Sequence, residues 1–89
     1  MIARTATIVN KLGLHARAAG KLVQVAQNYG ARVEITSEHH KANGKSIMSV
    51  LMLQAGIGTQ VEIIVEGDDE REAMDAILGL IEDKFGEGE

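Results

Sequence analysis

The chain has 89 residues, 45% of them hydrophobic and 25% charged, which is the composition of one soluble globular domain covering residues 1–89. The absence of cysteine excludes a disulfide scaffold, a thiol nucleophile and a thiolate metal site. With only three histidines left as soft ligands, we expect no metal site and no cofactor. No apolar run approaches the roughly 20 residues that span a bilayer, and the first ten residues lack the apolar stretch of a signal peptide. We therefore expect a cytoplasmic protein without membrane insertion.

The formal net charge of −4 is distributed unevenly along the chain. Residues 1–65 carry seven basic and three acidic residues, whereas residues 66–89 carry two basic and ten acidic ones. Because Tyr29 and Phe85 are the only aromatic residues, the stacking platform of a nucleic-acid binder is missing. The basic part favours docking to an acidic protein or to a small anion. Charge alone leaves open the alternative that an acidic C-terminal helix only keeps the protein soluble.

The pattern of apolar residues predicts seven elements along the chain. They are a strand at 2–9, a helix at 16–28, a strand at 32–37, a short strand to Ala42 after a hairpin turn near Glu38–His40, a helix at 47–53 capped by Ser46, a strand at 60–66, and a final helix that begins after Asp69. Asp69 and Glu72, three residues apart, indicate a capping box at the start of that last helix.

Each long strand has one apolar and one polar face, which is typical of a mostly antiparallel sheet with one side in contact with water. The predicted fold class is therefore α+β. We expect an open-faced β-sandwich, with a four-stranded, mostly antiparallel sheet and three helices on one face, in the order βαββαβα.

The segment from Gly13 to Ala19 carries the strongest chemical signal. His15 stands where a loop becomes a helix, and the first turn of a helix offers unpaired N–H groups and a partial positive charge. Arg17 adds a guanidinium that can hold a phosphoryl oxygen. Both features stabilise negative charge placed on the imidazole and disfavour its protonated form, so the pattern fits a histidine that accepts and releases a phosphoryl group. From spacing alone, an ordinary surface histidine is the alternative.

Ser46 is a second candidate for function. Its simplest role is to cap the short helix that follows, and a phosphate on its side chain would also be favourably placed at a helix N-terminus. A helix of about two turns cannot bury every apolar residue that it carries. Once Val50 and Leu53 are assigned to the core, some of the remainder must face solvent, as residues of docking sites do: Ile47, Met48, Leu51 and Met52.

The other two histidines do not suggest a site. His39 and His40 are adjacent, so in a strand their side chains point to opposite faces and cannot form a compact metal site. We interpret both as solvated turn or edge residues. The sequence also lacks a Walker-type loop, a nucleophile elbow and a pair of carboxylates at catalytic spacing.

With these motifs in place, the chain resembles the HPr family, the histidine-containing phosphocarrier proteins of the bacterial phosphoenolpyruvate-dependent sugar phosphotransferase system. The resemblance covers essentially the whole chain. It rests on the length, the order of the elements, the sequence GLHAR at 13–17, the sequence GKSIMSV at 44–50 and the acidic final helix. The histidine motif and the serine motif at this separation form a far more specific signal than either motif alone.

The resemblance implies roles for individual residues. His15 would carry the phosphoryl group on its Nδ1 nitrogen, with Arg17 and the backbone N–H groups of Ala16 and Arg17 holding the phosphate. Ser46 would be the regulatory serine that a dedicated kinase modifies in some bacteria. The partner-docking patch would comprise Ile47, Met48 and Leu51.

The resemblance also implies partners and an activity. A phosphorylated enzyme I would supply the phosphoryl group, and enzyme IIA proteins would receive it for sugar uptake. Through Ser46, the chain would also interact with an HPr kinase/phosphorylase and a catabolite-control regulator. The expected protein is a monomeric carrier that forms a transient phosphohistidine, and it is expected not to be an enzyme.

Two positions depart from the family pattern. Ala18 stands where the family commonly has proline, but alanine is the best helix former, so the start of the helix should survive. Leu12 stands where sugar-branch members often have a small polar residue, and the sequence NKLG at 10–13 resembles the nitrogen-branch paralogue NPr. The choice between the two branches therefore stays open, as does a purely regulatory protein that acts through Ser46.

Overall fold

The computed structural model describes residues 1–38 and 40–89. Eight elements follow one another along the chain: β1 (Ile2–Thr7), α1 (Ala16–Gln27), β2 (Arg32–Ser37), β3 (His40–Asn43), α2 (Ile47–Leu51), β4 (Gln60–Glu66), α3 (Glu70–Glu82) and the 3₁₀ turn η1 (Lys84–Gly86). The order of strands and helices predicted from the sequence is confirmed, and η1 is an addition to it.

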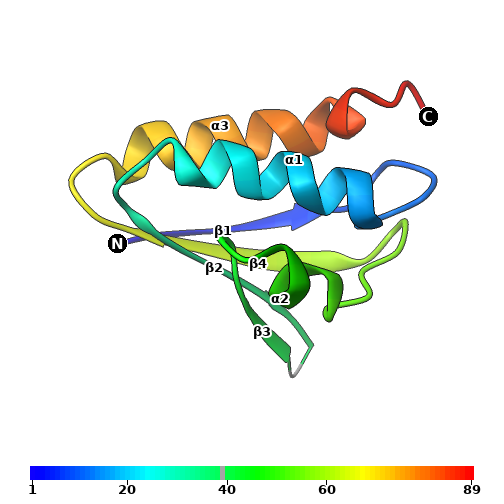
Figure 1. The fold of residues 1–89 in the computed structure, drawn as a ribbon, viewed down its shortest axis with the longest axis horizontal. Coiled ribbons are helices and arrows are strands. Elements are labelled where there is room, and N and C mark those ends of the chain that lie inside the picture. Colours follow the sequence, from blue (N-terminus) through cyan, green and yellow to red (C-terminus); the bar gives the residue numbers. More distant parts are fainter. Residues whose placement is uncertain (39) are drawn as a thin grey trace.

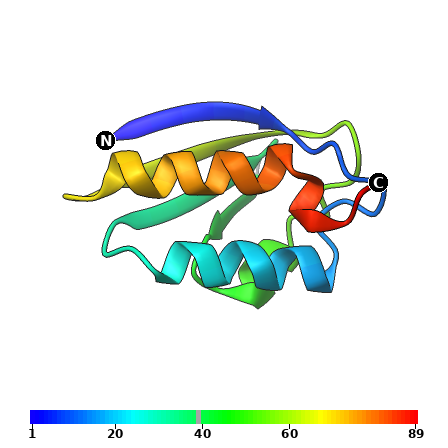
Figure 2. The same ribbon diagram turned by 90° about the horizontal axis from the view of Figure 1, so that it is seen from above.

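The four strands form one sheet in the order β1-β4-β2-β3, with all three neighbouring pairs antiparallel. Helices α1 and α3 lie side by side over one face, while α2 lies beside α1 near β3 (Figures 1 and 2). The alternation that predicted this arrangement is clearest in β4, where Val61 is buried while Glu62 is exposed. The α+β open-faced sandwich is thus confirmed.

The core fills the layer between the sheet and the two long helices. Its helical members recur at the spacing of one helix face: Ala18, Ala19, Leu22, Val23 and Ala26 on α1, and Ala73, Met74, Ile77 and Ile81 on α3. Phe85, the only phenylalanine of the chain, lies in η1 and is fully buried. Its burial holds the segment after α3 against the body of the protein, at the end of the molecule where α1 begins (Figures 1 and 2).

Two predicted elements are shorter in the structure than the apolar pattern suggests. The strand predicted at 2–9 ends at Thr7, because the fully buried side chain of Asn10 bonds the Gly13 carbonyl at 2.8 Å and bends the chain into a loop. The helix predicted at 47–53 ends at Leu51, and tighter i→i−3 bonds such as Leu53 N–H to Val50 O (3.1 Å) follow it. Leu53 is still buried, as predicted.

The capping box predicted from Asp69 and Glu72 is wrong. The Asp69 side chain makes no capping bond to α3. Its two carboxylate oxygens instead accept the N–H groups of Gly30 and Ala31, both at 2.9 Å. The carboxylate therefore ties the loop between α1 and β2 to the start of α3. This contact joins residues almost 40 positions apart, which a local sequence motif cannot reveal.

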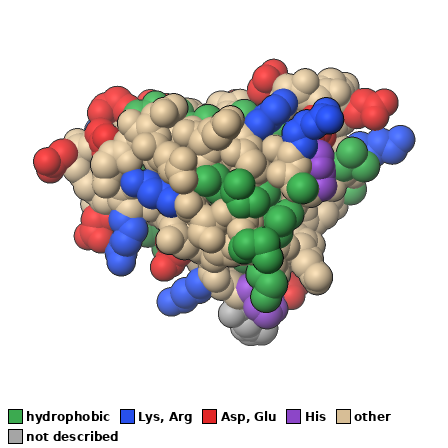
Figure 3. Space-filling model, in the orientation of Figure 1, with side chains coloured by type: hydrophobic (Ala, Val, Ile, Leu, Met, Phe, Trp, Pro, Cys, Tyr) green, Lys and Arg blue, Asp and Glu red, His purple; other side chains and the backbone are tan. Residues whose placement is uncertain are grey.

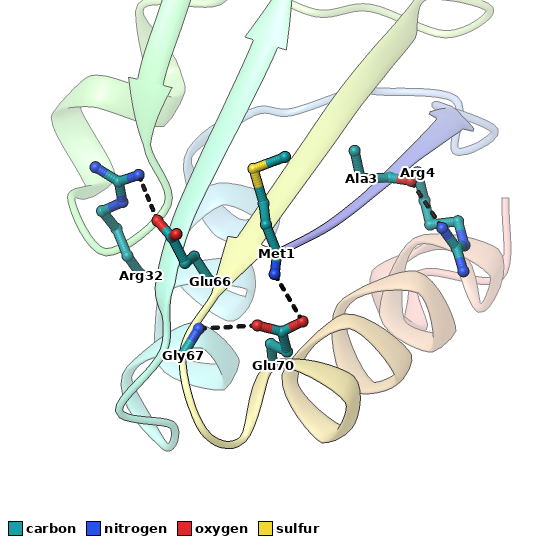
Figure 4. Close-up of polar contacts among 7 residues, drawn as sticks. All are labelled: Met1, Ala3, Arg4, Arg32, Glu66, Gly67 and Glu70. Carbon is teal, nitrogen blue, oxygen red and sulfur yellow. Dashed lines mark hydrogen bonds and ion pairs between the residues drawn. The ribbon is translucent and has the colours of Figure 1, made fainter.

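The start of α3 is held by a different carboxylate. Glu70 accepts the N–H of Gly67 at 3.1 Å and the α-amino group of Met1 at 3.0 Å (Figure 4). These two contacts join the first residue of the chain to the loop between β4 and α3. Across the neighbouring strands, Arg32 pairs with Glu66 at 2.9 Å, but both side chains are exposed, so this ion pair adds little stability.

We predict that the Asp69 contact makes the stability of the fold depend on pH. The Gly30 N–H, followed by the Ala31 N–H, lowers the pKa of Asp69 below its ordinary value of about 3.9. A carboxyl with a lowered pKa in the folded state stabilises the protein above the unfolded pKa and loses that effect as the pH falls through the folded pKa. Asp69→Asn should therefore lower the melting temperature most near neutral pH, and the deficit should shrink as the pH falls below about 4.

Thermal unfolding of the wild type and the variant, followed by circular dichroism across this pH range, measures the effect. Asp68→Asn is the matched control, because Asp68 is the exposed neighbour of Asp69. A deficit of the same size at every pH would show that the charge of Asp69 does not contribute.

Candidate functional site

His15 occupies the N-cap position of α1, at the end of the loop that follows β1. Its carbonyl accepts the first helical bond from Ala19 N–H at 2.8 Å, while its side chain makes no capping bond and is 28% exposed. The structure thus places the imidazole where the sequence predicted it, at the junction of loop and helix and open to solvent.

The loop before His15 is fixed by a close backbone contact. Gly13 has a φ of +67°, and a Cβ atom there would lie 2.5 Å from the Ala55 carbonyl oxygen. Leu14 is buried and donates its N–H to that carbonyl at 2.8 Å. Only glycine combines this backbone conformation with so close an approach. The contact therefore fixes the chain immediately before the partly exposed imidazole.

The first turn of α1 provides hydrogen-bond donors beside His15. The N–H groups of Ala16 and Arg17 have no acceptor among the residues that the structure describes. Such groups carry the partial positive charge of a helix N-terminus. The Arg17 side chain is exposed and forms no ion pair with any described residue. The sequence-predicted group of His15, Ala16 and Arg17 is thus brought together on one turn, with its donors facing no acceptor of the described chain.

His15 opens into a surface hollow with an excess of positive charge. The lining includes three cations and two acidic residues: Lys11, Arg17, Lys21, Glu87 and Glu89. Leu12, Ala16 and Gly86 complete the lining. A hollow of this composition favours an anion that can contact the cations while it approaches the imidazole.

The structure adds Glu87 to the site, a residue that no sequence motif indicates. Its Oε2 contacts the Nε2 of His15, and its Oε1 accepts the Asn10 side-chain amide at 3.0 Å. The Asn10 hydrogen bond first, and the contact with His15 in addition, lower the pKa of Glu87 below its ordinary value. Because 72 positions separate His15 from Glu87, no local motif joins them. The only signal in the sequence is an acidic residue shortly after the last helix.

Ser46 caps α2 as predicted. Its Oγ accepts the Ser49 N–H at 3.3 Å, and the Ser49 Oγ in turn accepts the Asn43 N–H at 2.9 Å. The Ser46 side chain is partly exposed. Ser46 thus lies in a different element from His15, at the start of α2 and not at the start of α1.

An apolar surface surrounds α2, as Figure 3 shows. Ile47 is 45% exposed and Met48 is 70% exposed, so the predicted exposure of these two side chains is confirmed. Leu51, the third predicted member, is only partly exposed, and Val50 is fully buried. Met52, 73% exposed, extends the surface beyond the predicted patch.

Of the other two histidines, only His40 lies among the described residues, and it forms no second site there. His40 is exposed in β3, which fits its interpretation as an edge residue, whereas His39 lies outside the described residues. Within residues 1–38 and 40–89, no group of three or more metal-binding side chains is close enough to hold a metal ion. In the same part of the chain, no helix has the length and apolar character needed to cross a membrane.

Comparison with known proteins gives a consistent result. Residues 2–83 match the family model described as the PTS HPr component phosphorylation site. The chain is 53% identical to the phosphocarrier protein HPr of Cupriavidus necator and 47% identical to that of Neisseria meningitidis, in each case over 89 residues and the full length of both proteins. The crystal structure of an HPr from Thermoanaerobacter tengcongensis superposes with a TM-score of 0.94 at 44% identity, covering 98% of both chains.

A catabolite repression HPr of Bacillus subtilis, whose crystal structure is described as a swapped dimer, is a more distant relative. It superposes with a TM-score of 0.76 at 32% identity, over 94% of this chain and 97% of that one. The match of sequence, fold and motif positions along the whole chain shows that this protein belongs to the HPr family of phosphocarrier proteins of the phosphotransferase system.

Proposed function

We propose that this chain accepts a phosphoryl group from phosphorylated enzyme I on His15 and passes it to enzyme IIA proteins for sugar uptake. The observation that carries the proposal is the partly exposed imidazole at the positive end of α1, which lines the same hollow as Arg17, in a chain of the HPr family. As the family resemblance implies, this exchange would take place in the cytoplasm.

The chemistry is an exchange between two histidines. A lone pair of the His15 imidazole attacks the phosphorus of the donor, a new P–N bond forms, and the donor's P–N bond breaks with its electron pair returning to the donor nitrogen. The free N–H groups of Ala16 and Arg17 and the guanidinium of Arg17 can hold the phosphoryl oxygens. Because the partner supplies the other half of this environment, the chain acts as a carrier and not as a self-sufficient enzyme.

The exposed side chains of Ile47 and Met48 on α2, with Leu51 at their margin, would dock the partner proteins. Ser46 lies directly before these residues, so its phosphorylation by an HPr kinase/phosphorylase would change the same surface. A catabolite-control regulator is then the partner that would recognise the phosphorylated form.

Two alternatives share these residues. The sequence NKLG at 10–13 favours a carrier of the nitrogen branch, and incubation with each of the two enzyme I paralogues separates the branches. A purely regulatory protein would use Ser46 and the α2 surface without charging His15. The proposed carrier becomes labelled from phosphoenolpyruvate and enzyme I, whereas a pure regulator does not.

His15→Ala should abolish the acid-labile, base-stable label that labelled phosphoenolpyruvate and enzyme I place on the wild type. The fold should persist, because the His15 side chain makes no capping bond to α1. His40→Ala is the matched control, since His40 is exposed in β3 and lies outside the proposed site. If the His15→Ala variant still becomes labelled, another residue is the acceptor and the proposed role of His15 is wrong.

Arg17→Ala should slow transfer to enzyme IIA by at least about tenfold, which corresponds to the loss of one charge-assisted hydrogen bond. The melting temperature should change little, because the Arg17 side chain is exposed and forms no ion pair with the described residues. Arg71→Ala, which removes an exposed arginine near the start of α3, should leave the transfer rate unchanged. If Arg17→Ala lost stability in proportion to rate, Arg17 would be a structural residue.

Ser46→Asp should weaken binding to enzyme I while circular dichroism and melting temperature stay close to those of the wild type. The helix start tolerates the added negative charge, whereas the neighbouring apolar contact gains a hydrated group. Ser46→Ala should bind normally and lose only the cap, about 1 kcal/mol of stability. Gln60→Glu adds the same charge at an exposed position of β4 and serves as the control. The test measures the affinity of all these proteins for enzyme I at one salt concentration. If Ser46→Asp and the wild type bind equally well, Ser46 is only a helix cap and does not contribute to docking.

A further inference from the structure

We propose that Glu87 is a positioning residue for the transfer: its carboxylate holds the tautomer of His15 that carries hydrogen on Nε2 and leaves the Nδ1 lone pair free to attack phosphorus. This inference rests on the proposed function of His15. It assigns a role to a side chain that lies after the last helix and that the phosphoryl-transfer motif of α1 does not include.

The contact itself sets the tautomer. Glu87 Oε2 lies against the Nε2 of His15. An ionised carboxylate can only accept a hydrogen bond, so the imidazole nitrogen that faces it must carry the hydrogen. In a neutral imidazole the other nitrogen, Nδ1, then holds the available lone pair. The Asn10 amide and, more weakly, the charge of Lys21 lower the pKa of Glu87, which keeps its carboxyl ionised at neutral pH.

Asn10 fixes the carboxylate in turn. The Asn10 side chain is fully buried, and its amide nitrogen donates to Glu87 Oε1 at 3.0 Å and to the Gly13 carbonyl at 2.8 Å. Because both neighbours are acceptors, the amide nitrogen must face them, which settles the orientation of the amide group. Asn10 and Gly13 belong to the loop that ends at His15. The carboxylate is therefore held by the same loop that positions the imidazole.

The segment around Glu87 is attached on both sides. Two residues before it, Phe85 is fully buried and its carbonyl accepts the Lys21 ammonium at 2.6 Å. Two residues after it, a main-chain oxygen of Glu89 accepts the N–H of Lys11 at 2.8 Å. The contact with His15 is thus part of a set of bonds between the last residues and the site, and not an isolated meeting of two surface side chains.

The carboxylate also assists the transfer itself. As the Nδ1–P bond forms and the donor's N–P bond breaks, positive charge develops on the His15 ring. The ring keeps its hydrogen on Nε2, and the Glu87 carboxylate stabilises the charge without taking the proton. The Glu87 carboxylate contacts Nε2, the ring nitrogen that does not bond phosphorus. The ammonium of Lys21 compensates part of the negative charge of this carboxylate.

The test uses a change of one atom. In Glu87→Gln, the Asn10 amide attracts the oxygen of the new side chain, so the NH₂ group faces His15. That group can donate only to an unprotonated Nε2, which moves the hydrogen to Nδ1 and blocks the nucleophile. Glu87→Gln should therefore reverse the tautomer, whereas Glu87→Ala should give a mixture of both forms. Glu82→Gln removes an exposed acid from the end of α3 and is the matched control.

Ring ¹⁵N chemical shifts of labelled histidine, recorded at a pH at which the imidazole is neutral, report the tautomer without any transfer reaction. We expect a protonated Nε2 in the wild type and in Glu82→Gln, and a protonated Nδ1 in Glu87→Gln. The rate of labelling by enzyme I should fall by on the order of tenfold or more in Glu87→Gln, and less in Glu87→Ala.

Unchanged ring shifts and an unchanged rate in Glu87→Gln would overturn the role of Glu87 while leaving His15 as the carrier. Faster labelling of either Glu87 variant would also overturn it, since the carboxylate would then obstruct the site. If the wild type takes no label, the proposed function of His15 is overturned instead. The role of Glu87 in the transfer is then overturned with it.

Discussion

The site depends above all on one close contact between two loops. Gly13 and Leu14 lie against Ala55, where a side chain at position 13 would collide with the carbonyl that Leu14 needs as its hydrogen-bond acceptor. This contact fixes the chain immediately before α1, so the next residue, His15, begins the helix at a set position. The helix donors and the imidazole then share one turn. A longer or more mobile loop would leave the same residues present but their relative positions unfixed, and positioning is the main contribution that a phosphoryl carrier can make.

The charges around this turn form a second level of organisation. Lys11, Arg17 and Lys21 make the hollow attractive to a phosphoryl group, and the N-terminus of α1 adds its partial charge. Glu87 brings a negative charge into the same hollow, but it is bound to Asn10 and directed at a single ring nitrogen. In the proposed function, the positive groups hold the phosphoryl group, while the carboxylate orients the imidazole that would receive it.

The sequence predicts those parts of the protein that local periodicity determines. The alternation in 60–66 predicts a strand with one buried face, and the helical spacing around Leu22 predicts a helix that packs on it. Both predictions are correct, because burial of one face determines each pattern. Ser46 was predicted as a cap because the capping bond spans only three residues. Asp69 shows the limit: its spacing from Glu72 fits a capping box, but two backbone donors from a distant loop take its carboxylate. Glu87 shows the same limit, since only the folded chain brings it to His15. Local motifs therefore locate the proposed acceptor, His15, whereas tertiary contacts bring Glu87 to its side chain.

The proposed role of His15 is tested most directly by locating the phosphoryl group at the level of a single nitrogen. Protein with ¹⁵N-labelled histidine is phosphorylated by phosphoenolpyruvate and enzyme I, and the coupling between ³¹P and the ring nitrogens of His15 is measured by nuclear magnetic resonance. If His15 carries the phosphoryl group as proposed, phosphorus should couple directly to Nδ1, and Nε2 should remain free of phosphorus. Coupling to Nε2, or a phosphoryl group on any other residue, would contradict it.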